Sequence, residues 1–470
     1  MTGRRGEKPP HESRSAIESS PHVERATAPP PGPLQPFHLP EVRAGALPNG
    51  LALRSMERGQ VPLVSARLVL AAGEISVPRE RAGLAVLTGD SLQGGTARRS
   101  GVQLAEALES LGSALRVSVG WEAMSVEFTC LAERLDEMLS LLAEVVREPS
   151  FPDEEVERIR RQRLATIHQR RMEPDERADD ELDRAIFAPD HPFHRSLAGT
   201  AEAVGSLGAA DARTYAAASY GAAGGGFVLV GDIPRERVVE LGERHFGEWL
   251  PNRSGAYPSF EAPASERRVV IVNRPGSVQS ELRIGLPGPS RGHPDEVPLR
   301  VANLALGGSF TSRLNLSLRE RHGFTYGARS GFAFRKRGGL FSISTAVQTD
   351  VTVAALGETM EVFRRFVEEG PSPVEMERSR DYLAGVFPLR MESTSQLADR
   401  LAELVIYGLP HDYHHRYRDE IRGVQIEGAR AAVLAHLDPA TCAVVLVGDA
   451  DRIASGVSEL GLGPLEVLDA

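Results

Sequence analysis

The chain repeats one pattern of segments, and this repetition limits the folds that its 470 residues can adopt. A charged stretch with Glu157-Arg158 returns as a similar stretch with Glu377-Arg378, FVLVGD returns as VVLVGD, and GGT returns as GGS. On matched residues the three offsets are 377 − 157 = 220, 449 − 232 = 217 and 307 − 94 = 213. Three matches in the same order, at nearly the same offset, indicate two copies of one domain.

Each copy alternates strand-like with helical patterns, which predicts an α+β fold. Apolar residues at spacings of three and four predict a helix over residues 135–146. The apolar run at 61–71 alternates only roughly, so we expect a strand that is buried on both faces. The stretch 251–265 is rich in Pro, Ser and Gly and predicts the linker. We therefore expect a disordered Pro-rich tail at 1–38 and two domains at 39–255 and 256–470.

Composition excludes several classes of function. The net charge is −10, which argues against binding to nucleic acids, because phosphate affinity comes from clustered Lys and Arg. The sequence contains no run of 18 apolar residues, so we expect no membrane span. The first residues lack the apolar region of a signal peptide, so we expect a cytoplasmic protein, or a periplasmic one if the start codon is misassigned. The two cysteines, Cys130 and Cys442, fit buried free thiols.

The stretch 307–330, GGSFTSRLNLSLRERHGFTYGARS, carries the most distinctive pattern in the second copy. Leu314, Leu318 and Arg319 fall at helical spacing, and Gly323 predicts the end of that helix. Tyr326 is expected to start the next strand, so Arg319 and Tyr326 would flank one helix-to-strand turn and could point into one cavity. The residues alone also allow a surface arginine and a half-buried tyrosine.

Together with residues 72–100 and the two Gly-Asp strand ends, this stretch resembles the insulinase (pitrilysin) family of zinc metallopeptidases. The likeness covers about residues 40–465 and is strongest to the bacterial and mitochondrial-processing-peptidase types. The resemblance implies two homologous α/β-sandwich domains that form a clamshell around a chamber. It also implies a peptide as the substrate.

The resemblance implies a zinc site in the first domain that this chain has lost. The family binds zinc through His-x-x-Glu-His on a helix, with the Glu as general base and a further Glu downstream. The corresponding positions here are Val86, Gly89 and Asp90, and the downstream ligand falls near Ile167 or His168. We therefore expect no cofactor in this chain, no peptidase activity on its own, and zinc only in a partner subunit.

The family's other active-site pair is retained. Arg319 and Tyr326 match an Arg and a Tyr, seven residues apart, that bind the substrate backbone across the chamber. This chain is thus expected to be the non-catalytic, substrate-binding subunit of a heteromeric zinc peptidase, paired with a homologous subunit that carries the zinc motif. The alternative is a structural or peptide-binding homologue with no proteolytic partner. Residues 115–119 are the candidate strand edge for pairing with a peptide.

Two histidine-containing segments offer weaker alternatives. The segment PHDYHHRY, with His411, Asp412, His414 and His415, suggests a metal cluster or, more simply, a polar helix start. The HPFH segment at 191–194 is expected to lie in a loop without a ligand role.

Overall fold

The computed structural model describes residues 32, 36–251 and 267–469. By contacts, the described residues from Phe37 onward form one compact unit. Apart from residues 32 and 36–38, the predicted tail lies outside the described residues, and so does the predicted linker apart from Pro251. The domain boundary at 255/256 lies outside them as well.

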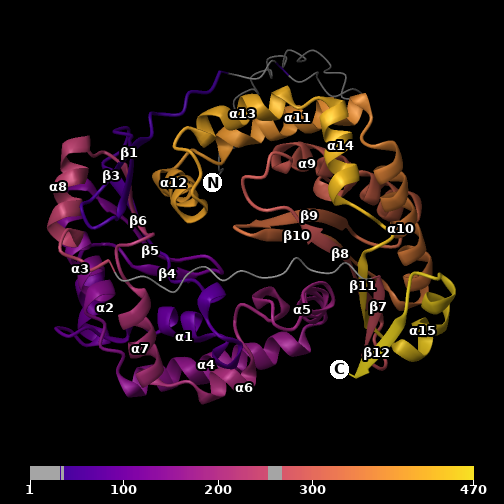
Figure 1. Ribbon diagram of the computed structural model, residues 1–470, viewed down its shortest axis with the longest axis horizontal. Helices are drawn as coiled ribbons and strands as arrows, with labels where there is room; N and C mark the ends of the chain where they lie inside the picture. Colours follow the sequence, from indigo (N-terminus) through magenta and orange to yellow (C-terminus); the bar gives the residue numbers. More distant parts are fainter. Residues whose placement is uncertain (1–31, 33–35, 252–266, 470) are drawn as a thin grey trace, which may run out of the picture. The chain divides into compact units, whose positions relative to one another are not determined.

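Two six-stranded sheets organise the unit formed by residues 37–470 (Figure 1). The first sheet has the strand order β1-β2-β6-β3-β5-β4, and the second has the order β12-β7-β11-β8-β10-β9. We call the part built on the first sheet the N-terminal domain and the part built on the second sheet the C-terminal domain. The strands are β1 (Arg43–Ala46), β2 (Ala52–Glu57), β3 (Leu63–Leu70), β4 (Arg116–Val119), β5 (Met124–Leu131), β6 (Gly226–Gly231), β7 (Arg268–Asn273), β8 (Gln279–Gly288), β9 (Ala328–Arg335), β10 (Gly338–Gln348), β11 (Ala443–Gly448) and β12 (Leu465–Asp469).

The two sheets share one topology, so the predicted duplication is confirmed. In both sheets the first and fifth strands of the repeat are parallel, as in β2 with β6 and β7 with β11. The other equivalent pairs are antiparallel, and β2 and β7 begin 268 − 52 = 216 residues apart. The sheets differ in one edge strand: β1 pairs antiparallel with β2, whereas β12 pairs parallel with β7.

Fifteen α-helices in the described part of the chain surround these sheets. The predicted helix at 135–146 is confirmed as α3, whose apolar side is buried in the core of the N-terminal domain. None of the described helices combines the length and the apolar character that a membrane crossing requires. The helices are α1 (Leu84–Asp90), α2 (Gly101–Ser110), α3 (Leu135–Arg147), α4 (Asp153–Met172), α5 (Pro174–Ile186), α6 (Ala201–Ser206), α7 (Ala209–Ser219), α8 (Arg235–Phe246), α9 (Glu296–Asn303), α10 (Thr352–Glu369), α11 (Pro373–Leu389), α12 (Thr394–Tyr407), α13 (Tyr413–Gly423), α14 (Ile426–His436) and α15 (Ala450–Glu459).

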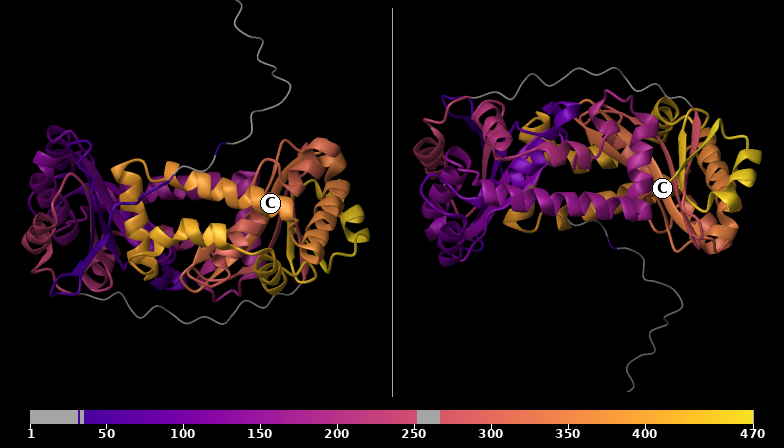
Figure 2. Two further views of the ribbon diagram at one scale, coloured as in Figure 1. Left: turned by 90° about the horizontal axis from the view of Figure 1, so that it is seen from above. Right: turned by 90° about the horizontal axis from the view of Figure 1, so that it is seen from below.

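The domains exchange one helix each. Helix α12 of the C-terminal domain packs on β3 and β6 of the first sheet, and α5 of the N-terminal domain packs on β8 and β11 of the second (Figures 1 and 2). Strand β3 is therefore buried on both faces, as predicted: Val64 and Leu68 lie in the core of their own domain, whereas Val69 lies in the cluster that α12 joins.

A buried arginine marks each exchanged helix. Arg67 on β3 donates to Asp399 of α12 at 2.8 Å, and Arg283 on β8 donates to Asp179 of α5 at 2.5 Å. The two arginines are 283 − 67 = 216 residues apart and occupy equivalent places in the repeat. Because each buried cation is paired with a carboxylate from the other domain, each sheet depends on the other domain to complete its packing.

Candidate functional site

The site implied by the zinc motif lies on α1, a short helix that begins after Gly83. Gly83 has a φ of 92° and leads into the helix, whose N-terminal N–H groups face a buried carboxylate. Glu74 accepts from the backbone N–H groups of Gly83 at 2.6 Å and Ala85 at 3.1 Å, and the guanidinium of Arg195 lies 3.3 Å away. A negative charge at a helix N-terminus is favourable, so Glu74 fixes where α1 starts and which way it points.

The position of the family's general base is closed by packing. Gly89 lies against the edge strand β4, and a Cβ atom at this position would come within 2.4 Å of Cγ2 of Val119. Val117 and Met124 would also lie within 3.6 Å of that atom. A glutamate therefore cannot be placed at residue 89 without moving Val119 or the helix.

The position of the second histidine is occupied by an ion pair. Asp90 lies 3.3 Å from the guanidinium of Arg163, which projects from α4. Burial raises the pKa of Asp90, and Arg163 opposes that rise by stabilising the carboxylate. The guanidinium of Arg163 thus pairs with the one carboxylate on this helix that could bind a metal ion.

The remaining positions supply no ligands. Val86 is buried and has no donor atom, Ile167 is buried in α4, and His168 is exposed on the same helix. Zinc requires three or four N, S or O ligands, and this helix offers only Asp90, which Arg163 already neutralises. The residues present do not fit a zinc ion.

A cavity of about 960 Å³ opens beside the C-terminal end of α1. Asp90, Gln93, Arg99 and Arg158 line part of its wall. Its arginines are paired, because Arg99 binds Glu144 and Arg158 binds Glu155. The cavity therefore presents balanced charges to a ligand.

In the C-terminal domain, Arg319 lies in a π-helical segment, Asn315–Arg321. Its guanidinium stacks on the ring of Phe310 at 4.1 Å and lies 3.6 Å from Glu320. Within the described residues, Nη1 of Arg319 has no hydrogen-bond partner although that atom is buried. The side chain thus keeps donor capacity that the domain does not use.

The predicted position of Tyr326 needs correction. Tyr326 does not start a strand: it lies in a bend two residues before β9, and 97% of it is exposed. The prediction was wrong because the loop after Gly323 runs for several residues before pairing with β10 begins at Ala328. Among the described residues, no hydrogen bond joins Tyr326 to Arg319.

Two asparagines that sequence reasoning missed, Asn315, which is buried, and Asn303, which is half-buried, hold the end of this loop in place. Asn315 donates to the carbonyl of Ala328 at 2.9 Å and accepts from its N–H at 3.0 Å. Asn303 donates to the carbonyl of Ser330 at 2.9 Å. An asparagine within a helical pattern was the signal that could have indicated this role. Its side-chain amide can form hydrogen bonds with the backbone N–H and C=O groups of a neighbouring strand.

The predicted strand edge at 115–119 is confirmed as β4, which pairs with β5 and ends the first sheet. In the second sheet the equivalent edge is β9. The tips of the two hairpins meet: the N–H of Lys336 donates to Glu122 at 3.0 Å, and Arg335 stacks over Trp121 at 5.7 Å. The two edge strands therefore belong to hairpins in direct contact.

The histidines of PHDYHHRY do not form a metal cluster. His414 is buried with Nε2 bonded to the carbonyl of Arg400, and Nε2 of His415 bonds to the carbonyl of Pro40. In the 191–194 segment, His191 accepts from the N–H of Phe193. In the described chain, one group of three possible ligands does converge, formed by His293, Asp295 and His436, which sequence reasoning missed.

Comparisons with known proteins agree with this geometry. Residues 55–201 match the model of the insulinase family (peptidase family M16), and residues 206–383 match the model of the peptidase M16 inactive domain. The chain is 24% identical over 385 residues to the non-peptidase homolog YmxG of Helicobacter pylori, covering 81% of this chain and 88% of that protein. It is 26% identical over 411 residues to an uncharacterized zinc protease of Mycobacterium tuberculosis, covering 86% and 92%.

A solved structure shares the fold. The crystal structure of a peptidase M16 inactive domain from Pseudomonas fluorescens superposes with a TM-score of 0.81 at 26% identity, covering 87% of this chain and 98% of that one. The expected duplicated two-domain architecture is therefore confirmed by both the structure and the comparison.

Proposed function

Because the chain belongs to the insulinase (peptidase M16) family, we propose that it is the non-catalytic, substrate-binding subunit of a heteromeric zinc peptidase. It would contribute Arg319 and Tyr326 to a site whose zinc and general base lie in a homologous partner. The observation that carries this proposal is the packing of Gly89 against Val119, because a base at this position would require Val119 or the helix to move. The relative named a non-peptidase homolog is consistent with such a role.

The difference between the two domains supports a role in substrate binding without catalysis. Around α1, the changed positions are filled by packing and by the pair of Asp90 with Arg163. Around Arg319, side chains remain available: Phe310 is 67% exposed and Tyr326 is 97% exposed. Exposed aromatic residues beside an arginine are typical of binding surfaces, whereas a domain without a ligand gains little from exposing them.

The chemistry of the retained pair suits a peptide. A guanidinium offers a fixed fork of N–H donors, and a phenol offers one O–H donor. Donors of this kind stabilise the oxyanion that develops when a peptide carbonyl is attacked. In this proposal, Arg319 and Tyr326 supply only these hydrogen bonds, and the partner supplies the attacking water.

The substrate segment would bind as an added strand. The turn bond from the N–H of Gly120 to the carbonyl of Ala123 sets the register of the β4–β5 hairpin. Because hydrogen-bonded and non-hydrogen-bonded pairs alternate, the backbone groups of Val117 and Val119 point away from β5. An extended peptide can bond to these groups with little demand on its sequence.

The second candidate is a peptide-binding homologue with no proteolytic partner. The edge strand β4 favours it, since β4 belongs to this chain and needs no other subunit to bind a strand. Both candidate functions use the same peptide-binding surface. They differ in whether the bound peptide is then cleaved by a partner subunit.

Reconstitution distinguishes them. The purified chain is mixed with a homologous subunit that carries His-x-x-Glu-His, and cleavage of a quenched fluorescent peptide is followed. The first candidate predicts cleavage with the mixture, and a loss of about tenfold or more for Arg319→Ala and Tyr326→Phe.

Matched controls are available in the same domain. Arg321→Ala removes an exposed arginine two residues away, and Tyr382→Phe removes the hydroxyl of an exposed tyrosine on α11. Mixtures that contain either control variant are expected to cleave the peptide at the same rate as mixtures that contain the unmodified chain. Equal rates for all four variants would remove the assigned role of the pair, and peptide binding without cleavage in any mixture would favour the second candidate.

A further inference from the structure

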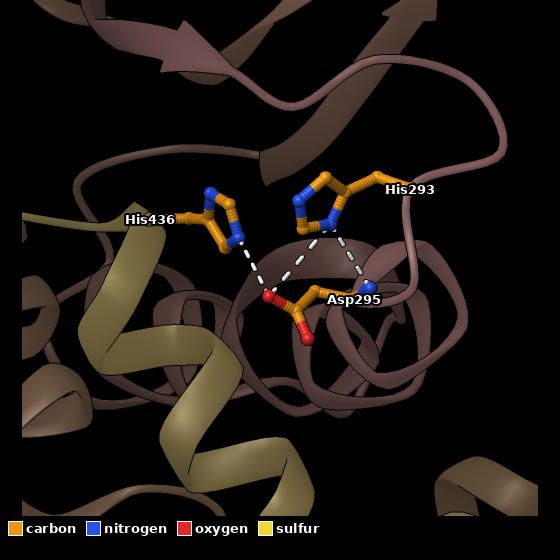
Figure 3. Close-up of side chains that lie close together, drawn as sticks. All are labelled: His293, Asp295 and His436. Atoms are coloured by element: carbon orange, nitrogen blue, oxygen red, sulfur yellow. Dashed lines mark hydrogen bonds and ion pairs between the residues drawn. The ribbon is translucent and has the colours of Figure 1, made fainter.

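Three possible metal ligands converge at one place in the C-terminal domain, far in sequence from the degenerate zinc motif (Figure 3). His293 lies in the loop after β8, and Asp295 immediately precedes α9. His436 is the last residue of α14, which packs against α9. Their ligand atoms all lie within 4.8 Å of one another.

The carboxylate of Asp295 stands between the two imidazoles. Its Oδ2 lies 2.8 Å from Nε2 of His436 and 3.7 Å from Nδ1 of His293 (Figure 3). The N–H of Asp295 also donates to Nδ1 of His293 at 3.1 Å. Because Nδ1 accepts this bond, it is the unprotonated nitrogen of the ring, and a metal ion would replace the N–H of Asp295 at its single lone pair.

These separations fit a tetrahedral ion. Zinc binds imidazole nitrogen and carboxylate oxygen at about 2.0–2.1 Å, which places tetrahedral ligand atoms roughly 3.3 Å apart. The two observed separations, 2.8 Å and 3.7 Å, lie on either side of that value.

The backbone around the ligands is well fixed. The N–H of Glu296 donates to the carbonyl of His293, and the N–H of Leu299 donates to that of Asp295. His436 sits at the C-terminal end of a helix, where the helix dipole favours a cation. The nearby Glu296 adds no free charge, because Arg291 and Arg300 both bind it.

The group is accessible without being fully exposed. The exposed fractions of the three side chains are 37% for His293, 35% for Asp295 and 20% for His436. This leaves an open side at which water or an external ligand could take a fourth position, while the protein holds the other three. Three protein ligands and one open position are typical of zinc sites that exchange a ligand.

We propose that His293, Asp295 and His436 bind one divalent transition-metal ion of the zinc class. Bound metal would tie the start of α9 to the end of α14, two segments separated by more than a hundred residues of sequence. Since metal binds the folded site and not the unfolded chain, it would stabilise the C-terminal domain. This proposal does not depend on the proposed function, because the site lies outside the Arg319 region and the α1 helix.

The alternative is a hydrogen bond from His436 to Asp295 that ties the helices without metal. Titration of the chelator-treated full chain with zinc chloride, followed by calorimetry and by the melting temperature, separates the two. The proposal predicts one ion per chain and a melting temperature that rises with zinc.

Two variants make the test specific. His436→Gln keeps an N–H donor towards Asp295 but removes the imidazole, and His293→Gln removes the other imidazole; each should weaken zinc binding by more than about tenfold. His411→Ala, which removes a histidine outside the group, should bind zinc as the unmodified chain does. No zinc binding by the unmodified chain, or equal binding by the Gln variants, would overturn the proposal.

Discussion

The carboxylate of Asp90 lies 3.3 Å from the guanidinium of Arg163, so an ion pair between α1 and α4 occupies the place of the family's metal ligands. The pair explains how the chain tolerates an acidic residue at a partly buried position. A metal ion with ligands on both helices would link α1 to α4. The ion pair of Asp90 with Arg163 links the same two helices without a metal ion.

Removing Arg163 tests whether this pair holds α1 against α4. Both side chains are partly exposed, so we expect Arg163→Ala to lower the free energy of unfolding by only about 0.5–1 kcal/mol. In a double-mutant cycle measured by urea unfolding, Asp90→Ala in the same chain should recover part of that loss. Fully additive effects of the two substitutions would show that the pair contributes nothing to stability.

The packing of Gly89 predicts a cost for any side chain there. Gly89→Ala should destabilise the protein by about 1–3 kcal/mol, because its Cβ would overlap Val119. Combining it with Val119→Ala should relieve the overlap. Gly428→Ala on α14, where a Cβ meets nothing within 4 Å, should instead be neutral or stabilising. A destabilisation by Gly89→Ala no greater than that of Gly428→Ala would contradict the closed site.

The exchanged helices predict an effect that crosses from one domain to the other. Leu401 is a buried residue of α12 and packs in the cluster of β3 and β6, so Leu401→Ala should cost about 2–5 kcal/mol. It should speed hydrogen exchange in β3 and β6, which belong to the other domain. Leu356→Ala, equally buried on α10, is the control. If β3 and β6 respond equally to both substitutions, the exchange of helices has no specific energetic role.

Glu74 predicts a pH dependence of stability. Burial raises the pKa of Glu74 to about 7, although the N–H groups of Gly83 and Ala85 and the charge of Arg195 oppose the shift. Because the pKa of Glu74 is higher in the folded state, the folded protein favours the protonated residue. Its contribution to the free energy of unfolding is fully present below the unfolded pKa, about 4.3, and is lost as pH rises through about 7. The size of this loss is on the order of 3–4 kcal/mol.

Urea unfolding of Glu74→Gln between pH 5 and 8 measures this contribution. The stability of the unmodified chain should fall more steeply over that range than that of the variant, whose amide does not ionise. Glu80→Gln, at an exposed position nearby, should keep the steep fall. Parallel curves for the unmodified chain and Glu74→Gln would mean that the folded pKa is not raised.

Much of the fold could be predicted because the repeat is visible in the sequence. The strand endings at Asp232 and Asp449, and the double burial of β3, follow from local patterns that the structure retains. Helix α5 escaped prediction because its sequence is highly charged, and its buried residues Leu182 and Ile186 form a face only when the second sheet lies against them. Local pattern cannot reveal which domain a helix will cover.

The candidate site was predicted less completely, for a similar reason. The positions of Val86, Gly89 and Asp90 follow from the motif, but the partner of Asp90 was not foreseen. Arg163 is one of several arginines on α4, and only the packing of α4 against α1 selects it. His293, Asp295 and His436 are likewise distant in sequence and converge only through the packing of α9 against α14.

The most direct test of the account is peptide cleavage by the isolated chain with zinc supplied, measured in the His436→Gln background so that metal at the second site plays no part. The account predicts no cleavage above the buffer rate for the chain alone, and cleavage once a subunit with the zinc motif is added. Cleavage by the isolated chain that a chelator removes and added zinc restores would contradict it.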